Sequence, residues 1–422
     1  MSCLSDAPPD TAKFRSDVLG VLENLVKGAG LLLARSDSDC RLSICKSVIN
    51  LLSHDQARAI LLEADLLEDF VSLAFPTQPE ESGAGDEGYE GSDLVPVQSA
   101  ALKTLYSICA SPEFSTKLTL DSSLTRKSLT SIRGSNGAPG QPGIPLNVAC
   151  ILLASLVTSE AIAQDLFQRE QIHTYLPQLL RNTDPGVLYP AISLLSRLAL
   201  LPPAKTALVE NGLLGSLQPF FSVDTAPQVQ REAVIAFRRM IAGCPRAVAT
   251  ITAGSADVPP STRPGGTDEG ELPTHAVFSL FRRTSDRTTK MEIGRLSIEI
   301  CRLVRSAAAG DAQEMGDRFA RTVGPSDGRP FTDSIALAIL HGGGPGPCGE
   351  GWFGFAVLSL WAAGRRLVLD CLDRDEKLRD EVRNVAAAAH GEGEGEGEAR
   401  RGPSFQNLRL VLAQLDSDEA VS

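Results

Sequence analysis

The sequence predicts an all-α protein in which similar groups of helices repeat along the chain as a right-handed solenoid. The first observation is a fixed period, because the same apolar helical pattern opens at Ala149, Ala191 and Ala233, and 191 − 149 = 233 − 191 = 42. The second is that Pro185 and Pro227 keep this spacing of 42 residues. The third is a composition with 43% hydrophobic but only 5% aromatic residues, which suits helices packed through aliphatic side chains. A fixed period of about 20 to 50 residues is the mark of a repeat architecture.

The period also sets the kind and the number of repeats. Units of about 40 to 47 residues are typical of armadillo and HEAT arrays, so we predict an armadillo/HEAT-type solenoid of about six to eight repeats. Each repeat in such an array needs only its neighbours, so one continuous solenoid is expected over residues 11–389. We expect a disordered N-terminus at 1–10, a Gly/Glu linker at 390–403 and a C-terminal helix and tail at 404–422.

Three segments rich in Pro, Gly and polar residues interrupt the helical pattern. They lie near residues 77–95, 121–145 and 254–270, and we predict that they are disordered insertions. Aligning the last helix of each repeat gives one reference position per repeat, held by Asn50, Ser107, Ser155, Arg197, Arg239 and Arg302. The gaps are 57, 48, 42, 42 and 63 residues, and each gap above 42 contains an insertion. The insertions are therefore expected between units.

The charge of the chain limits its partners. The formal net charge is −12 at pH 7, which argues against nucleic acid because phosphates demand a basic surface. An acidic cluster lies within residues 80–93, and a basic stripe occupies residues 282–305. The basic stripe has two interpretations, a solvated helix face balanced by nearby carboxylates or a surface for an acidic partner.

The cysteines and the N-terminus indicate a cytosolic protein. Nine cysteines are scattered without a CxxC pair, and this odd number in a long chain argues for free thiols in a reducing compartment. Residues 1–10 lack a basic segment followed by an apolar one, so no secretory signal is visible. The longest apolar runs, such as 148–157, are too short to cross a bilayer, so no integral membrane association is expected.

The phrases at residues 191–212, 227–241 and 291–296 resemble armadillo-repeat proteins, and among them the small-GTPase GDP-dissociation stimulators of the SmgGDS type. The armadillo pattern Ala-x-x-x-Leu-x-Asn-Leu-Ala is similar to residues 191–199, with Arg197 in place of the asparagine. Residues 197–212 resemble the stimulators' phrase RNLAIP..NK…L..AG, and residues 227–241 resemble PPVQ…LR.LI. Residues 291–296 resemble GESNRL, with Gly294 at the asparagine. The likeness covers roughly residues 145–305.

The resemblance implies a regulator of Rho- and Ras-type small GTPases. Such a protein binds the GTPase in its concave groove and promotes GDP dissociation and nucleotide exchange, or acts as a chaperone for prenylated GTPases. The residues expected to line the groove are the six reference positions together with Glu292 and Arg295 of the GESNRL-like stretch. The alternative is a non-enzymatic scaffold that grips an extended peptide, although only two tryptophans, Trp352 and Trp361, are available for that purpose.

No set of residues for covalent catalysis or metal binding is legible. The five histidines are dispersed, and none pairs with another at i, i+4, so neither a metal nor a cofactor is predicted. Residues 344–349 match GxGxxG formally, but their two prolines remove amide donors, and we predict a plain loop there. No GxxxxGK[ST] sequence exists, so the chain is not itself a GTPase. We predict a regulatory binding protein with possible exchange-factor activity, rather than an enzyme with its own active site.

Overall fold

The structure is a computed structural model in which helices account for all the regular secondary structure of the described residues. It describes residues 119–134, 145–222, 226–252, 273–307, 328–341, 345–390 and 406–413, together with isolated positions before residue 119. The chain divides into two compact units, Met1–Leu194 and Leu195–Ser422. The predicted insertions at 77–95 and 254–270, the predicted linker between residues 391 and 403, and the reference residue Asn50 lie outside the described residues.

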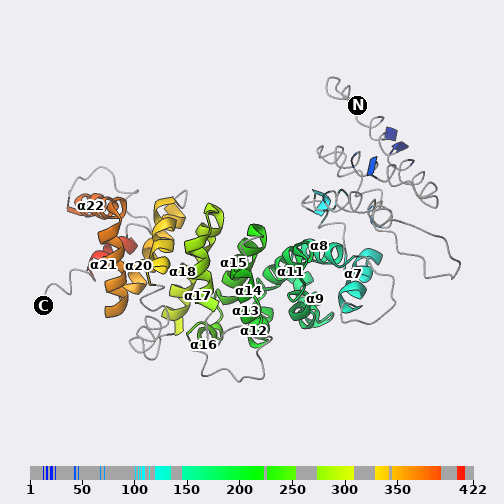
Figure 1. Cartoon of the computed structure of the whole chain (residues 1–422), viewed down its shortest axis with the longest axis horizontal. Helices are drawn as coiled ribbons and strands as arrows, with labels where there is room; N and C mark the ends of the chain where they lie inside the picture. Colours follow the sequence, from blue (N-terminus) through cyan, green and yellow to red (C-terminus); the bar gives the residue numbers. More distant parts are fainter. Residues whose placement is uncertain are drawn as a thin grey trace. The chain divides into compact units, whose positions relative to one another are not determined.

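The first unit contains helices α7 to α10 and the beginning of α11. Their bounds are α7 (Ser123–Gly134), α8 (Leu146–Leu156), α9 (Glu160–Gln168), the 3-10 helix η2 (Ile172–Thr174), α10 (Leu176–Leu179) and α11 (Pro185–Leu198). Helix α8 is apolar on almost every side, and it packs against α7, beside which it is drawn in Figure 1. Helix α9 begins at Ser159, whose side chain accepts a hydrogen bond from the Ile162 amide and so caps the first turn.

Helix α7 corrects one sequence prediction. Residues 121–145 were expected to form a disordered insertion, but residues 123–134 form a regular helix. Leu124, Leu129 and Ile132 are buried on one side of it. The prediction was wrong because the Gly/Pro-rich sequence after residue 134 was extended backwards over an amphipathic segment whose apolar spacing follows a helix.

The second unit begins with the last turn of α11 and continues through one complete repeat. That repeat consists of α12 (Pro202–Glu210), the short helices α13 (Leu213–Ser216) and α14 (Gln218–Ser222), and α15 (Pro227–Ile241). Gly212 precedes α13 with φ 74°, a left-handed conformation that glycine adopts without steric cost. Helices α12 and α15 start 42 residues after α9 and α11, because 202 − 160 = 227 − 185 = 42. The structural repeat therefore has the period read from the sequence.

The remaining helices extend the second unit towards its C-terminal end. Their bounds are α16 (Ala247–Thr252), α17 (Pro273–Arg283), α18 (Arg287–Ala307), α20 (Pro345–Leu358), α21 (Ala362–Arg374) and α22 (Glu376–His390), with further helical residues at 328–341 and 406–413. Helix α15 packs on α18, α18 on α20, and α20 on α21, in the order that Figure 1 shows. Helices α16 and α17 both contact α18. The 254–270 segment connects α16 to α17 along the chain, and its expected place between two repeats stays a prediction.

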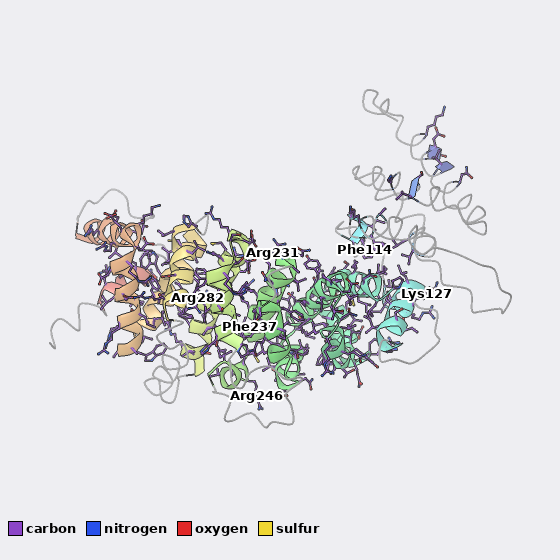
Figure 2. The ribbon with its side chains drawn as sticks, viewed as in Figure 1. Phe114, Lys127, Arg231, Phe237, Arg246 and Arg282 are labelled. Atoms are coloured by element: carbon purple, nitrogen blue, oxygen red, sulfur yellow. The ribbon has the colours of Figure 1, made fainter. Side chains whose placement is uncertain are left out.

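Aromatic side chains fill the layer between the long and the short helices of the second unit. Phe237 of α15 is fully buried and meets Phe221 of α14 edge-on, with 5.9 Å between ring centroids. Figure 2 shows Phe237 within the body of the unit, whereas Arg246 lies at its periphery. Phe278 of α17 meets Phe331 in the same way, at 5.3 Å. This core fixes the rotation of α15 and α18, and hence the side chains that they present on the opposite side.

Candidate functional site

The three arginines at reference positions lie within the second unit, near the ends of three successive long helices. Arg197 is in the last turn of α11, Arg239 is in the last turn of α15, and Arg302 is near the end of α18. All three are half-buried, whereas the residue that follows each of them, a leucine or a methionine, is buried. The apolar neighbour turns into the core and leaves each arginine at the edge of the open side of its helix.

Arg239 is held by polar groups on two helices. Its Nη1 donates a hydrogen bond of 2.9 Å to the hydroxyl of Ser196 at the end of α11. Glu232, two turns earlier on α15, interacts with both Arg239 and Ser196. Burial lowers the pKa of Arg239 in spite of Glu232, and burial raises the pKa of Glu232 in spite of Arg239. The pair is thus partly removed from water, and its charges depend on each other.

Glu292 occupies a position that is apolar in the two preceding repeats. It lies ten residues before the reference position Arg302, just as Val187 and Val229 lie ten before theirs. Glu292 is 7% exposed, compared with 5% and 1% for the two valines. A carboxylate this deep requires positive partners.

Two arginines supply that charge to Glu292. Arg238 of α15 places Nη2 3.3 Å from one carboxylate oxygen, and Arg295 of α18 places Nη1 2.5 Å from the other. This contact with Arg238 is an ion pair that crosses from α15 of one repeat to α18 of the next. The Nε atom of Arg238 is buried there without a hydrogen-bond partner. Glu292 and Arg295 were both predicted as site residues, and the structure brings them into direct contact.

Arg302 links α18 to α20. Its guanidinium forms ion pairs with Glu299 on its own helix and with Glu350 on α20, the latter at 3.2 Å. Burial lowers the pKa of Arg302, but the two carboxylates more than offset this and leave the pKa raised above its ordinary value. The guanidinium also lies 5.5 Å from the ring centroid of Phe353 on α20. Arg302 therefore stays charged and links α18 to α20 through its ion pair with Glu350.

We call these side chains of the second unit the polar ridge. It comprises Ser196, Arg197, Glu232, Arg238, Arg239, Glu292, Arg295, Glu299, Arg302 and Glu350. Sequence reasoning missed Glu232 and Glu350, and it took Glu299 only as a carboxylate that balances the basic stripe at residues 282–305. Helical spacing could have linked two of these carboxylates to their arginines, because Glu232 precedes Arg239 by seven residues and Glu299 precedes Arg302 by three, which places each pair on one side of its helix.

The other predicted groove residues do not belong to the polar ridge. Ser107 and Ser155 lie in the first unit, and Asn50 lies outside the described residues. Ser107 is exposed, and its hydroxyl donates to the Lys103 carbonyl oxygen at 3.0 Å, within its own helix. Ser155 is half-buried near the end of α8.

The structure also explains two features on which the family resemblance rested. Lys205, in the phrase after Arg197, donates from Nζ to the carbonyl oxygen of Ala242 at 2.5 Å, and so caps the C-terminus of α15. A glycine at position 294 is explained by the close passage of α18 beside residues 328–341. A Cβ at Gly294 would lie 2.4 Å from the Ser334 carbonyl oxygen.

The GxGxxG-like sequence is part of a helix. We predicted a plain loop at residues 344–349, but α20 begins at Pro345 and includes the rest of the motif. Proline fits the first turn of a helix because its missing N–H would have no intrahelical partner there. In the described ranges, no group of three or more His, Cys, Asp or Glu side chains could hold a metal ion. No helix among these residues is both long and apolar enough to cross a membrane.

The chain resembles solved solenoid structures in fold and lies far from them in sequence. No known family matches the sequence, and no curated protein matches it. An engineered protein from a structural genomics consortium aligns with a TM-score of 0.52 at 16% identity, over 97% of this chain and 92% of that chain. SYS-1 in complex with POP-1 aligns with a TM-score of 0.51 at 10% identity, over 94% of this chain and 63% of that chain. A designed armadillo repeat protein aligns with a TM-score of 0.44 at 14% identity, over 68% and 99% of the two chains.

The predicted fold class is therefore confirmed: the chain is an all-α, armadillo-type solenoid. Its described repeat consists of two shorter helical segments followed by one long helix.

Proposed function

We propose that this protein is a binding scaffold whose polar ridge receives a segment of a partner protein. The observation that supports this most is the shared register of Arg197, Arg239 and Arg302 on consecutive long helices of one unit. Equivalent positions of stacked repeats form a ladder along the surface that solenoids use for binding. SYS-1, whose fold is similar, was solved in complex with POP-1, which is consistent with a protein partner for such a fold.

The chemistry of the polar ridge suits an extended polypeptide. A guanidinium carries five N–H donors, and the contacts of Arg239 with Ser196 and of Arg302 with Glu299 and Glu350 use only some of them. Ser196 holds Arg239, and Glu299 and Glu350 hold Arg302, so less side-chain entropy is lost when a partner binds. Donors fixed at a regular spacing can bind the backbone carbonyls or the carboxylates of a segment that runs along the helices.

For the identity of the partner we propose a small GTPase of the Rho or Ras type. The support is the similarity of residues 191–241 to the GDP-dissociation stimulators, within which Arg197 and Arg239 lie. A protein of this kind needs no covalent chemistry. It accelerates GDP release by binding the nucleotide-free GTPase more tightly than the GDP-bound form. A chaperone for prenylated GTPases would instead discriminate by the lipid.

The direct test mixes the purified full-length chain with prenylated and unprenylated Rho- and Ras-type GTPases loaded with a fluorescent GDP analogue. Faster release with at least one GTPase is the expected result, with binding measured in parallel by light scattering. If a GTPase binds without faster GDP release, the proposal of a binding scaffold stands. Exchange activity is then excluded in favour of a chaperone or adaptor activity. If no GTPase binds, the small-GTPase proposal is wrong.

A second experiment tests the polar ridge itself. Charge reversal at Arg239 would introduce a second negative charge near Glu232, whose charge already acts on that arginine. We therefore choose the double variant Arg197→Gln/Arg239→Gln, which keeps amide donors and removes both charges. It is expected to weaken partner binding at least about tenfold, the effect of losing one or two charge-assisted hydrogen bonds. The matched control is Arg246→Gln, a 71% exposed side chain that Figure 2 shows away from the core. Equal affinities for the two variants would exclude the ridge as the binding surface.

A further inference from the structure

The C-terminal end of α18 carries two guanidinium groups over one aromatic ring. Arg302 and Arg305, one turn apart on α18, each lie 5.5 Å from the ring centroid of Phe353 on α20. Phe353 is half-buried, so one part of its ring is fixed in the packing between the helices. A guanidinium that lies over an aromatic ring is held in orientation, and its N–H groups remain available to a further partner.

The two arginines differ in how their charges are balanced. Arg302 is paired with Glu299 and Glu350. Arg305 is exposed, and in the described part of the chain its contact with Phe353 is not accompanied by an ion pair with any carboxylate. Among the described residues, the end of the polar ridge therefore carries one positive charge without a carboxylate partner, on a guanidinium whose orientation is fixed by Phe353.

Among the long helices α11, α15 and α18, only α18 carries this arrangement. Arg305 lies three residues after the reference position Arg302, and the equivalent residues of the two preceding repeats are Leu200 and Ala242. Lys290, near the other end of α18, also lies over a ring, that of Phe281 at 5.3 Å, but an ammonium offers no planar fork. Among these positions, only the Arg305–Phe353 pair is built to hold a planar anion.

We infer that Arg305, stacked on Phe353, binds a side-chain carboxylate of an acidic segment in the partner protein, at the end of the polar ridge. The inference rests on the proposed binding function and adds the chemistry of the partner segment. Charge complementarity selects the occupant: a glutamate or aspartate supplies the charge that Arg305 lacks, and its two oxygens match the fork. A lysine-rich segment would meet Arg302 and Arg305 with like charge.

The test uses a short fluorescein-labelled peptide in which glutamate alternates with serine, and measures its binding to the full-length chain by fluorescence anisotropy. Two further peptides replace glutamate by glutamine or by lysine. The wild-type chain should bind the glutamate peptide at least about tenfold more tightly than the glutamine peptide, as expected for one charge-assisted contact. The affinity should fall as salt is raised.

Three variants locate the contact. Arg305→Glu should lose the preference for the glutamate peptide, and Arg305→Lys should keep only part of it, because the charge remains and the fork is lost. Phe353→Leu should also weaken the preference, since the guanidinium is no longer held. The matched control is Arg287→Glu, an exposed arginine near the start of the same helix, with the same change in net charge.

Two results would overturn the inference. One is an equal loss of affinity in Arg305→Glu and Arg287→Glu, which would mean that only the net charge matters. The other is glutamine- or lysine-peptide binding as tight as that of the glutamate peptide. The same variants separate this inference from the proposed function: if a GTPase binds the wild type and Arg305→Glu equally, but not Arg197→Gln/Arg239→Gln, the ridge is the binding surface and the acidic-segment inference alone fails.

Discussion

Helices α15 and α18 hold the same place in successive repeats, yet they meet their neighbours in different ways. In α15, the position ten residues before the reference arginine is Val229, and the helix packs there through an apolar contact. In α18, the equivalent residue is Glu292, and the helix is tied to its neighbour by an ion pair with Arg238. Eight residues before the reference arginine, α15 carries Arg231 and α18 carries Gly294.

The difference shows that the shared apolar pattern determines the fold of each repeat, whereas single positions within it can carry different side chains and make different contacts. The regular part of the pattern, the buried aliphatic residues, is common to both helices and requires only hydrophobic side chains of suitable size. The departures occur where two helices come unusually close or where a charge enters the packing. Substitutions in α18 should therefore have larger effects on stability than equivalent substitutions in α15.

The largest effect is expected from Gly294→Ala. The new Cβ would lie 2.4 Å from the Ser334 carbonyl oxygen, a backbone atom that cannot move without shifting residues 328–341. We expect the free energy of unfolding to fall by about 3 kcal/mol, the upper range for overpacking. Gly354→Ala in α20 is the matched control, because its Cβ would meet Ile298 and Ile335 at an ordinary 3.5 Å. Urea unfolding followed by circular dichroism measures both, and equal stabilities would refute the close approach.

A smaller loss is expected from Glu292→Val, which introduces the residue type of the two preceding repeats. The valine suits the burial, but it removes the partner of Arg238, whose side chain is only 24% exposed. We expect a loss of about 2 kcal/mol, less than for a fully buried pair because Arg238 reaches water.

The double variant Arg238→Leu/Glu292→Val checks this reasoning. It makes the α15–α18 contact apolar on both sides, so its unfolding free energy should return to within about 1 kcal/mol of the wild type. A double-mutant cycle in urea gives the coupling energy. The cycle also needs the single variant Arg238→Leu. If the stability losses of Arg238→Leu and Glu292→Val simply add in the double variant, the ion pair does not connect the helices energetically.

The repeat could be predicted from the sequence because it depends on spacing alone. The 42-residue offset of Ala149, Ala191 and Ala233 reappears as the offset between α9 and α12 and between α11 and α15. The register of Arg197, Arg239 and Arg302 followed from the same alignment. A helical period of 3.6 residues translates directly into which residues share a face.

Contacts between helices could not be predicted in this way. The partners of Arg302 include Glu350, 48 residues away, and Ser196 reaches Arg239 across 43 residues. Nothing in the local pattern states how close two helices approach, so the reason for Gly294 was hidden as well. The errors at α7 and at the start of α20 arose from composition, since Gly, Pro and polar residues were taken as loop without weighing the apolar spacing or the fit of proline to a first turn.

The ends of α15 and α18 offer a third comparison. The Ala242 carbonyl at the end of α15 receives a hydrogen bond from Lys205, whereas α18 ends with arginines over Phe353. Lys205→Met keeps the aliphatic stem and removes the donor, and should cost about 1.5 kcal/mol, as for hydrogen bonds from charged groups. Lys377→Met on α22, an exposed lysine, should change the stability by less than about 0.5 kcal/mol. Thermal unfolding of the two variants decides the point, and matching midpoints would exclude the cap as a stabilising contact.

The smallest predicted effect is a pH dependence of the folding stability. Its sign differs between a group on α15 and a group at the start of α18. Burial raises the pKa of Glu232 on α15 above its ordinary 4.5, so the folded chain binds this proton more readily than the unfolded chain. Hydrogen bonding from Thr289 lowers the pKa of Asp286, at the start of α18, below its ordinary 3.8. As the pH falls from neutral through these ranges, Glu232 adds stability when it becomes protonated, whereas Asp286 loses its stabilising contribution.

Urea midpoints measured from neutral pH down into this acidic range compare Glu232→Gln and Asp286→Asn with the wild type. Relative to the wild type, Glu232→Gln should lose stability as the pH falls, because it lacks the proton-linked gain. Asp286→Asn should do the reverse, since the wild type loses the Asp286 contribution that the variant never had. The two difference curves should therefore slope in opposite directions, and parallel curves would show that the partly buried Glu232–Arg239 pair behaves like an exposed helix cap.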